Sequence, residues 1–319
     1  MVGLDARVQV FGRLMRAASR TGVPQGWLAA LGGNPLRRGP VTDGLLGPTR
    51  PLTVTDGTVA GQVGPLAART YRPADATGPL PLVLAFHGGG WVLGSLDAMD
   101  RLCRTVAAGV GAVVVSVDYR LAPAHPWPAA AEDCLAATAD VAARAEELGG
   151  DATRLAVLGD SAGGNLAAVV SLMARDRGGP PIAVQALLYP ATDLTMSSPS
   201  MQENADAPVL TRATMLDFAA RYLAGADPVE PYASPLLTPD HTGLPPALVQ
   251  VAEHDPLRDD GVRYAAVLRA AGVPVRLTEY VGMPHGYLDH PWLCRSAPQA
   301  AAELVGELRT ALGARAAPS

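Results

Sequence analysis

Residues 155–170 read Leu-Ala-Val-Leu-Gly-Asp-Ser-Ala-Gly-Gly-Asn-Leu-Ala-Ala-Val-Val, and this stretch decides the fold. Its first four residues predict a buried strand, and the apolar run after Asn165 predicts a helix. Between them, glycines stand two positions before and two positions after Ser161. A strand, a sharp turn and a helix in this order hold the serine in a strained conformation, with its hydroxyl above the sheet. We therefore predict that Ser161 is a nucleophile.

Strand and helix patterns alternate on both sides of this stretch. Apolar runs of strand length, without the polar alternation of a half-exposed strand, are typical of strands covered on both faces. They occur at Leu82–Phe86, Ala112–Val117, Ile182–Tyr189, Ala247–Ala252 and Val275–Tyr280. A hairpin over 52–71, with Asp56-Gly57 as its turn signal, adds two more strands. The pattern predicts an α/β fold with a mostly parallel, doubly wound sheet of eight strands.

The alternation breaks once, at residues 191–235. This insertion carries several prolines around one helical stretch at about 212–223, and residues 1–50 resemble short helices broken by Gly-Pro pairs. Ligands of open α/β sheets bind at the carboxyl ends of the strands. We expect both segments to form a helical cap there, over a core made of residues 51–190 and 236–319.

The composition narrows the function classes. The 319 residues include 49% hydrophobic ones, the formal net charge is −5, and no run of like charges predicts a nucleic-acid partner. The chain contains no lysine, which excludes a Schiff-base or lysine-base mechanism, and its three scattered cysteines predict neither a disulfide framework nor a metal site. Apolar runs are too short to span a bilayer, and no signal peptide is recognisable. A cytoplasmic protein without stable membrane association is the expectation.

A second glycine-rich run follows the strand Leu82–Phe86 directly. It reads His87-Gly88-Gly89-Gly90 and lacks the Gly-Lys-Ser/Thr ending of a phosphate-binding loop. Backbone N–H groups of such a loop can stabilise the negative charge of a tetrahedral intermediate. We predict that Gly88, Gly89 and Ala162 donate to this oxyanion, with Gly90 as the alternative to Gly88.

The acid and the base should follow the last two strands, because the triad order in this fold is serine, acid, histidine. Asp255 follows the strand Ala247–Ala252, and His285 lies in the loop after Val275–Tyr280, with His290 as a fallback. His285 would take the proton of the Ser161 hydroxyl and pass it to the leaving alkoxide. Asp255 would hold the imidazole in the required tautomer.

Six motifs occur in order along the chain, and together they carry a family resemblance. They are His87–Trp91, Asp118–Pro123, Gly159–Gly164, Ser234–Leu236, Asp255–Leu257 and His285–Tyr287. The chain resembles the bacterial hormone-sensitive-lipase-like (family IV) carboxylesterases with a GDSAG elbow. The resemblance implies an α/β-hydrolase core with a cap, a small-molecule ester of short to medium acyl length as substrate, no cofactor or metal, and frequent homodimers. The family often has Phe where Tyr287 stands.

Further residues are expected to support the site. Asp118 and Arg120 are expected to form a structural pair that braces the oxyanion loop, and Asp160 to hydrogen-bond the surrounding loops. The candidates for the substrate pocket, for each of which core packing is the competing interpretation, are Trp91, Tyr189, Phe218, Tyr222 and Leu257.

Fold and triad do not distinguish an esterase from other hydrolases on the same scaffold. An amide or acetyl deacetylase, a lactonase and a lipase are the alternatives, although the charged residues of the 191–235 insertion are unlike an oil-binding lid. A non-catalytic small-ligand receptor is the alternative outside enzymes. Receptors that resemble this family lack the triad histidine, whereas His285 is present here.

Overall fold

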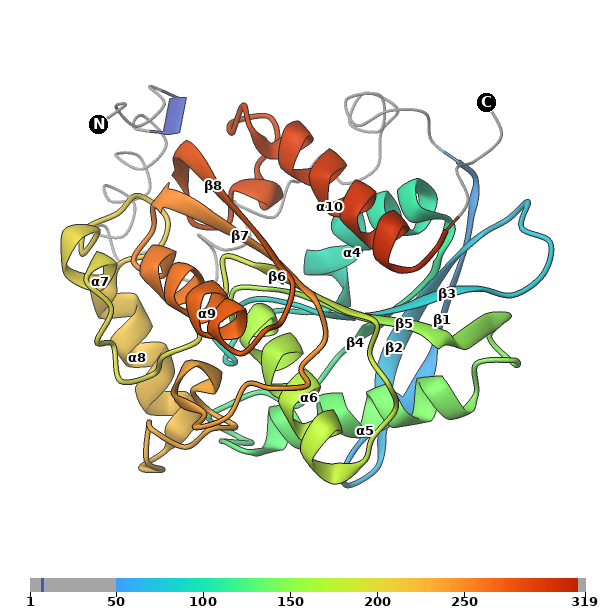
Figure 1. Cartoon of the computed structure of the whole chain (residues 1–319), viewed down its shortest axis with the longest axis horizontal. Helices are drawn as coiled ribbons and strands as arrows, with labels where there is room; N and C mark the ends of the chain where they lie inside the picture. The colour runs from blue at the N-terminus through green and yellow to red at the C-terminus, as the bar shows by residue number, and fades with distance from the viewer. Residues whose placement is uncertain (1–6, 9–49, 315–319) are drawn as a thin grey trace.

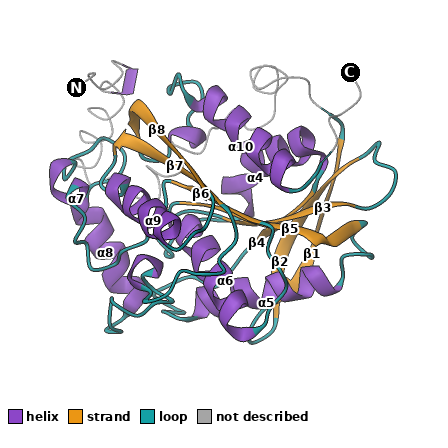
Figure 2. Ribbon diagram, in the orientation of Figure 1, coloured by secondary structure: helices purple, strands orange, loops and turns teal. Residues whose placement is uncertain are grey.

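The computed structural model describes residues 7–8 and 50–314 (Figure 1). The predicted N-terminal helices of residues 1–50 therefore lie almost wholly outside the described residues. In the described part, one twisted sheet is covered by helices on both faces (Figure 2). No helix of this part is long and apolar enough to cross a membrane.

The sheet has eight strands in the order β1-β2-β4-β3-β5-β6-β7-β8, and every neighbouring pair from β4 to β8 is parallel. Strand β2 runs antiparallel to both of its neighbours, β1 and β4. The prediction of a mostly parallel, eight-stranded, doubly wound sheet is confirmed. The strands are β1 (Leu52–Ala60), β2 (Pro65–Pro73), β3 (Leu80–Phe86), β4 (Val113–Val117), β5 (Gly150–Asp160), β6 (Val184–Leu188), β7 (Ala247–His254) and β8 (Val275–Pro284).

The hairpin turn lies elsewhere than predicted. Asp56 is part of β1 and pairs across the ladder with Arg69, whose guanidinium Nε lies 2.6 Å from the Asp56 carboxylate. This cross-strand ion pair occupies the side chain that would otherwise stabilise a turn. The chain reverses direction between β1 and β2, where the Gly61 N–H donates to the Gly64 carbonyl over 2.8 Å.

Two groups of helices cover the two faces. Buried residues of α5, α6 and α9 share one hydrophobic cluster, and those of α4 and α10 share the other. The helical elements are α4 (Leu96–Val106), η1 (Ala107–Gly111), α5 (Ala129–Ala143), α6 (Ala162–Arg177), α7 (Ser200–Glu203), α8 (Arg212–Leu223), η2 (Pro235–Leu237), α9 (Arg258–Ala270), η3 (Tyr287–Asp289) and α10 (Ala297–Ala311).

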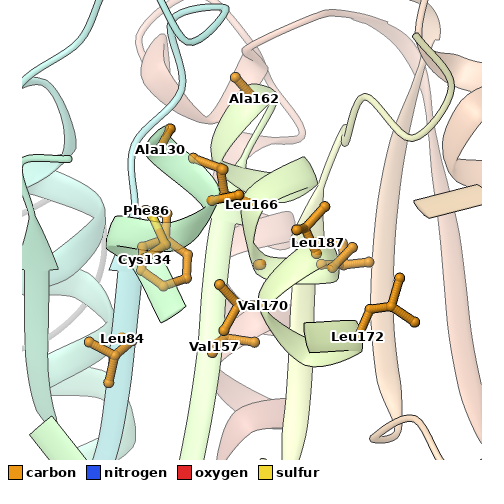
Figure 3. Close-up of a cluster of buried hydrophobic side chains, with 14 of the residues drawn as sticks. Leu84, Phe86, Ala130, Cys134, Val157, Ala162, Leu166, Val170, Leu172 and Leu187 are labelled. Carbon is orange, nitrogen blue, oxygen red and sulfur yellow. The ribbon is translucent and has the colours of Figure 1, made fainter. Parts of the chain in front are cut away.

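Helix α6 is the centre of the core. Every residue from Ala162 to Ala174 is buried, as expected of a helix that is apolar on all sides. Figure 3 shows Leu166 and Val170 of α6 in the cluster with Phe86 of β3 and Val157 of β5. Burying each such side chain contributes about 2 kcal/mol. The segment that begins at Ser161 is thus fixed in a close-packed interior.

Candidate active site

The turn between β5 and α6 consists of one residue, Ser161. Its φ of 55° and ψ of −117° lie in a region that side-chain-bearing residues rarely adopt. The Ser161 N–H donates to Leu188 O over 2.8 Å, which ties the turn to the end of β6. A Cβ on Gly163 would overlap the Phe86 carbonyl oxygen, so only glycine permits α6 to start this close to β3. The predicted strand–turn–helix is confirmed.

Ser161, His285 and Asp255 form a continuous chain of hydrogen bonds. The Nε2 atom of His285 lies 2.9 Å from the Ser161 Oγ, and Nδ1 lies 2.7 Å from the Asp255 Oδ2. The other carboxylate oxygen of Asp255 accepts the Leu257 N–H over 2.8 Å. Because an ionised carboxylate only accepts, Nδ1 carries the proton and Nε2 faces the serine hydroxyl as an acceptor. The sequence-predicted triad is therefore assembled, and the fallback His290 is not part of it.

Charges around the imidazole favour its protonated form. Burial by itself lowers the pKa of His285, but the negative charge and hydrogen bond of Asp255 more than offset this and raise it above 6.5. Asp160 and Asp289 act in the same direction. Burial also raises the pKa of Asp160 to about 7, and the charge of Asp289 adds to that rise.

The oxyanion loop differs from the prediction at one donor. The Gly88 N–H donates to the Asp160 carboxylate over 2.8 Å, so it is not available to a substrate oxygen. The predicted role of Gly88 is therefore wrong, and the predicted loop contact of Asp160 is confirmed. Within the described residues, no acceptor takes the N–H of Gly89 or Gly90. The N–H of Ala162, at the start of α6, likewise has no acceptor within residues 50–314.

Tyr119 supports this loop through two contacts with His87, its first residue. The Tyr119 hydroxyl donates to the His87 carbonyl over 2.6 Å, and the two rings stack 4.2 Å apart. The expected pair of Asp118 and Arg120 is wrong. The Arg120 guanidinium instead binds both oxygens of buried Asp133 on α5, over 2.7 and 2.8 Å. A bidentate partner with fixed geometry outcompetes a nearby single contact.

Four of the five pocket candidates are buried, and the fifth, Phe218, is only partly buried. Trp91 and Tyr222 are fully buried and their rings stack 4.5 Å apart, so they pack between the oxyanion loop and α8. Leu257 is buried too and carries the N–H that Asp255 accepts. The ring of Tyr189 meets His285 edge-on at 4.9 Å. Phe218 is only partly buried, and its ring lies directly over Gly90.

Two asparagines at the site were not predicted. The Asn165 amide donates to Ala191 O and Ala233 O over 2.8 and 2.9 Å, which joins both ends of the insertion to α6. The Asn204 amide donates over 3.1 Å to the carbonyl of Asp255. Asn165 stands just after the elbow, a position that could have indicated it. Asn204 has no local signal, because its partner lies 51 residues away.

No three His, Cys, Asp or Glu side chains among residues 50–314 converge as metal ligands would. The reactive groups that the structure brings together are a nucleophile, a base, an acid and N–H groups that find no acceptor in the described part of the chain.

Comparisons with known proteins place this site in a family. A family model described as alpha/beta hydrolase fold matches residues 83–289, which include the whole triad. The chain belongs to the α/β-hydrolase family. Within it, the chain lies in the hormone-sensitive-lipase-like branch that the six motifs indicated.

This α/β hydrolase is 48% identical over 253 residues to carboxylesterase NlhH of Mycobacterium tuberculosis, covering 78% of this chain and 79% of that protein. It is 46% identical over 265 residues to esterase LipI of the same organism, covering 82% and 83%. Among solved structures, it matches LAE6, an α/β hydrolase from the metagenome of Lake Arreo, with a TM-score of 0.87 and 35% identity. That match covers 98% of this chain and 100% of the other.

Proposed function

We propose that this chain hydrolyses carboxylic esters through an acyl-enzyme intermediate. The observation that carries the proposal is the unbroken hydrogen-bonded chain from Ser161 through His285 to Asp255, next to N–H groups that have no acceptor among the described residues. Relatives named carboxylesterase and esterase, 46–48% identical to this chain, support the same reaction class.

The first half of the reaction forms the acyl-enzyme. His285 Nε2 takes the Ser161 proton as Oγ attacks the ester carbonyl carbon. Negative charge then develops on the carbonyl oxygen. We assign its stabilisation to the N–H groups of Gly89, Gly90 and Ala162, since Asp160 already occupies that of Gly88. The imidazolium, held by the Asp255 carboxylate, gives the proton to the leaving alkoxide as the C–O bond breaks.

The second half releases the acid. Water attacks the acyl-enzyme while His285 takes its proton, and the same N–H groups stabilise the second tetrahedral intermediate. His285 then returns the proton to Ser161 Oγ. The Nδ1 bond to Asp255 is kept in every step, while Nε2 exchanges the proton in turn with Ser161 Oγ, the leaving oxygen and water, so the reaction requires a fixed imidazole position.

Residues 191–235 are proposed to form part of the cap over this site. Two contacts between α8 and the oxyanion loop support this proposal, the stack of Tyr222 on Trp91 and the position of Phe218 over Gly90. Because Phe218 is bulky and close to the proposed oxyanion position, we propose that it limits the substrate to short or medium acyl esters. A homodimer and a cytoplasmic location stay predictions that size-exclusion chromatography and cell fractionation can test. The contribution of residues 1–50 to the cap also stays a prediction.

The function is tested with p-nitrophenyl esters from acetate to laurate, beside the matching anilide. We expect turnover to be highest for short or medium chains and far slower for the anilide. A fluorophosphonate should label Ser161, and Ser161→Ala should abolish labelling and reduce turnover by at least about 10³-fold. Preference for the anilide would favour the amidase alternative, preference for laurate emulsions the lipase, and retained turnover in Ser161→Ala would refute the mechanism.

A further inference from the structure

Side-chain contacts connect the segment that carries the catalytic base, residues 285–290, to the rest of the molecule. Beyond Pro284, the last residue of β8, the backbone bonds within residues 285–290 are short-range ones, Asp289 N–H to Gly286 O and His290 N–H to Tyr287 O. Polar contacts connect this segment to the rest of the molecule. They include His285 to Asp255, the guanidinium of Arg101 to Leu288 O, and the hydroxyl of Tyr287 to Gln250.

Tyr287 is fully buried, two residues after the catalytic base. Its hydroxyl donates to the Gln250 Oε1 over 3.3 Å. Its ring meets Tyr189 edge-on at 5.2 Å, and Tyr189 in turn meets His285 edge-on at 4.9 Å. A displacement of the Tyr287 ring would therefore reach the imidazole both along the chain and through Tyr189.

The acceptor of this hydroxyl is itself fixed. Gln250 is fully buried on β7, and its Nε2 donates to Ala300 O and to the Glu303 carboxylate of α10, over 3.0 and 2.9 Å. Both of these partners are acceptors only. The amide N must therefore face α10 and the amide O must face Tyr287.

The carboxylate that orients Gln250 is kept ionised. Burial alone would raise the pKa of Glu303, but hydrogen bonds from Tyr280, Thr278, Arg276 and Gln250 more than offset this and lower it. An ionised acceptor makes a stronger hydrogen bond to the Gln250 amide than a neutral one would. The anchor thus extends from the base segment through the core of the sheet to the surface of α10.

We propose that Tyr287 is a positioning residue, whose hydroxyl holds His285 in place through Gln250. The proposal rests on the proposed esterase function, since it concerns the same base. Phenylalanine fills the same volume but leaves the Gln250 Oε1 without its donor and the segment with one fewer anchor. A small shift of the imidazole lengthens its bonds to both Ser161 and Asp255, and catalysis is sensitive to such misplacement.

The test compares Tyr287→Phe with Tyr264→Phe, using p-nitrophenyl butyrate. Tyr264 is a matched control, because it is equally buried but its hydroxyl has no partner among the described residues. We expect Tyr287→Phe to lower kcat about three- to tenfold with KM within about twofold, whereas Tyr264→Phe leaves both unchanged. Looser contact with Asp255 also weakens the effect that raises the pKa of His285. The acid limb of the kcat/KM profile should therefore move to lower pH in Tyr287→Phe only.

A second variant, Gln250→Met, removes the acceptor and keeps the Tyr287 ring, so the test stands even if Tyr287→Phe folds poorly. If the hydroxyl acts through Gln250, the double variant should lose no more kcat than the stronger single variant. Equal kcat in Tyr287→Phe and Tyr264→Phe, additive losses, or a lowered Tm with an unmoved acid limb would each overturn the proposal. If the unmodified chain hydrolyses no ester, the proposed function fails instead.

Discussion

Asp160→Asn removes an ionisable group beside the nucleophile and keeps the shape of the side chain. In the folded protein, the Asp160 carboxylate accepts the Gly88 N–H, and burial raises its pKa to about 7 from an ordinary 3.8. The asparagine oxygen can accept the same N–H, but the side chain cannot ionise. The substitution therefore separates the effect of the charge from that of the hydrogen bond.

The sign of the effect on stability follows from proton linkage. Between about pH 4 and pH 7 the folded protein keeps a proton on Asp160 that the unfolded chain has released, so the free energy of unfolding falls as pH rises through this window. The two pKa values differ by an amount equivalent to about 4 kcal/mol at most. Because Asp160 is partly exposed and water screens its charge, we expect about 2 kcal/mol.

The assay is unfolding by urea or heat at several pH values between about 4 and 8, at constant ionic strength. Relative to the unmodified chain, Asp160→Asn should gain about 2 kcal/mol of stability as pH rises across this range. Asp217→Asn, at an exposed carboxylate of α8, is the control and should show no such trend. A difference that stays constant with pH, or falls, would refute the reasoning.

A comparison of kcat between Asp160→Asn and Asp160→Ala tests the role of the hydrogen bond to Gly88. Asp160→Asn keeps the contact with Gly88, so its kcat at about pH 7 should stay within about threefold of the original. Asp160→Ala loses the contact and frees the oxyanion loop, and we expect a loss of about tenfold or more. Similar kcat values for the two variants would show that the contact does not position the loop.

Three further predictions concern the base, the loop support and the pocket. Because the pKa of His285 is raised, kcat/KM should decrease toward acidic pH with a midpoint above pH 6.5. A pH–rate profile measures this midpoint. Arg120→Ala leaves buried Asp133 without its cation and should cost about 3 kcal/mol in urea unfolding, against less than about 0.5 kcal/mol for exposed Arg221→Ala. Phe218→Ala should shift the preferred p-nitrophenyl ester to longer chains, and the same optimum as in the unmodified chain would exclude Phe218 as the limit.

The sequence was most informative where chemistry and local structure coincide. Ser161 was predictable because a glycine-flanked serine between an apolar strand and an apolar helix is typical of a nucleophile elbow and rare elsewhere. Asp255 and His285 followed from the order of the strands, since parallel strands deliver their carboxyl ends to one edge. Helix α8 was expected at about 212–223 and lies at Arg212–Leu223. These features follow from local sequence patterns and from the order of the strands.

What the sequence did not reveal depends on partners far apart in the chain. Gly88 and its neighbours are equivalent as residue types, and only the position of the Asp160 carboxylate, 72 residues away, decides which N–H is occupied. Arg120 found Asp133 on α5 instead of its near neighbour Asp118 because helix packing places that carboxylate in line with the guanidinium. Where the sequence offers several chemically similar donors or acceptors, tertiary contacts determine which of them pair.

The segment 159–165 is restricted in composition because several of its residues have separate tertiary partners. Gly163 permits the close approach to β3, Ser161 supplies the nucleophile, and Ala162 offers an N–H at the start of α6. Asp160 fixes the oxyanion loop through Gly88, and Asn165 fixes both ends of the 191–235 insertion. One short segment thus sets the positions of the nucleophile, the oxyanion donors and the proposed cap relative to one another. A substitution that removes these contacts, such as Asp160→Ala or Asn165→Ala, should therefore alter substrate selectivity as well as rate, although neither side chain belongs to the triad.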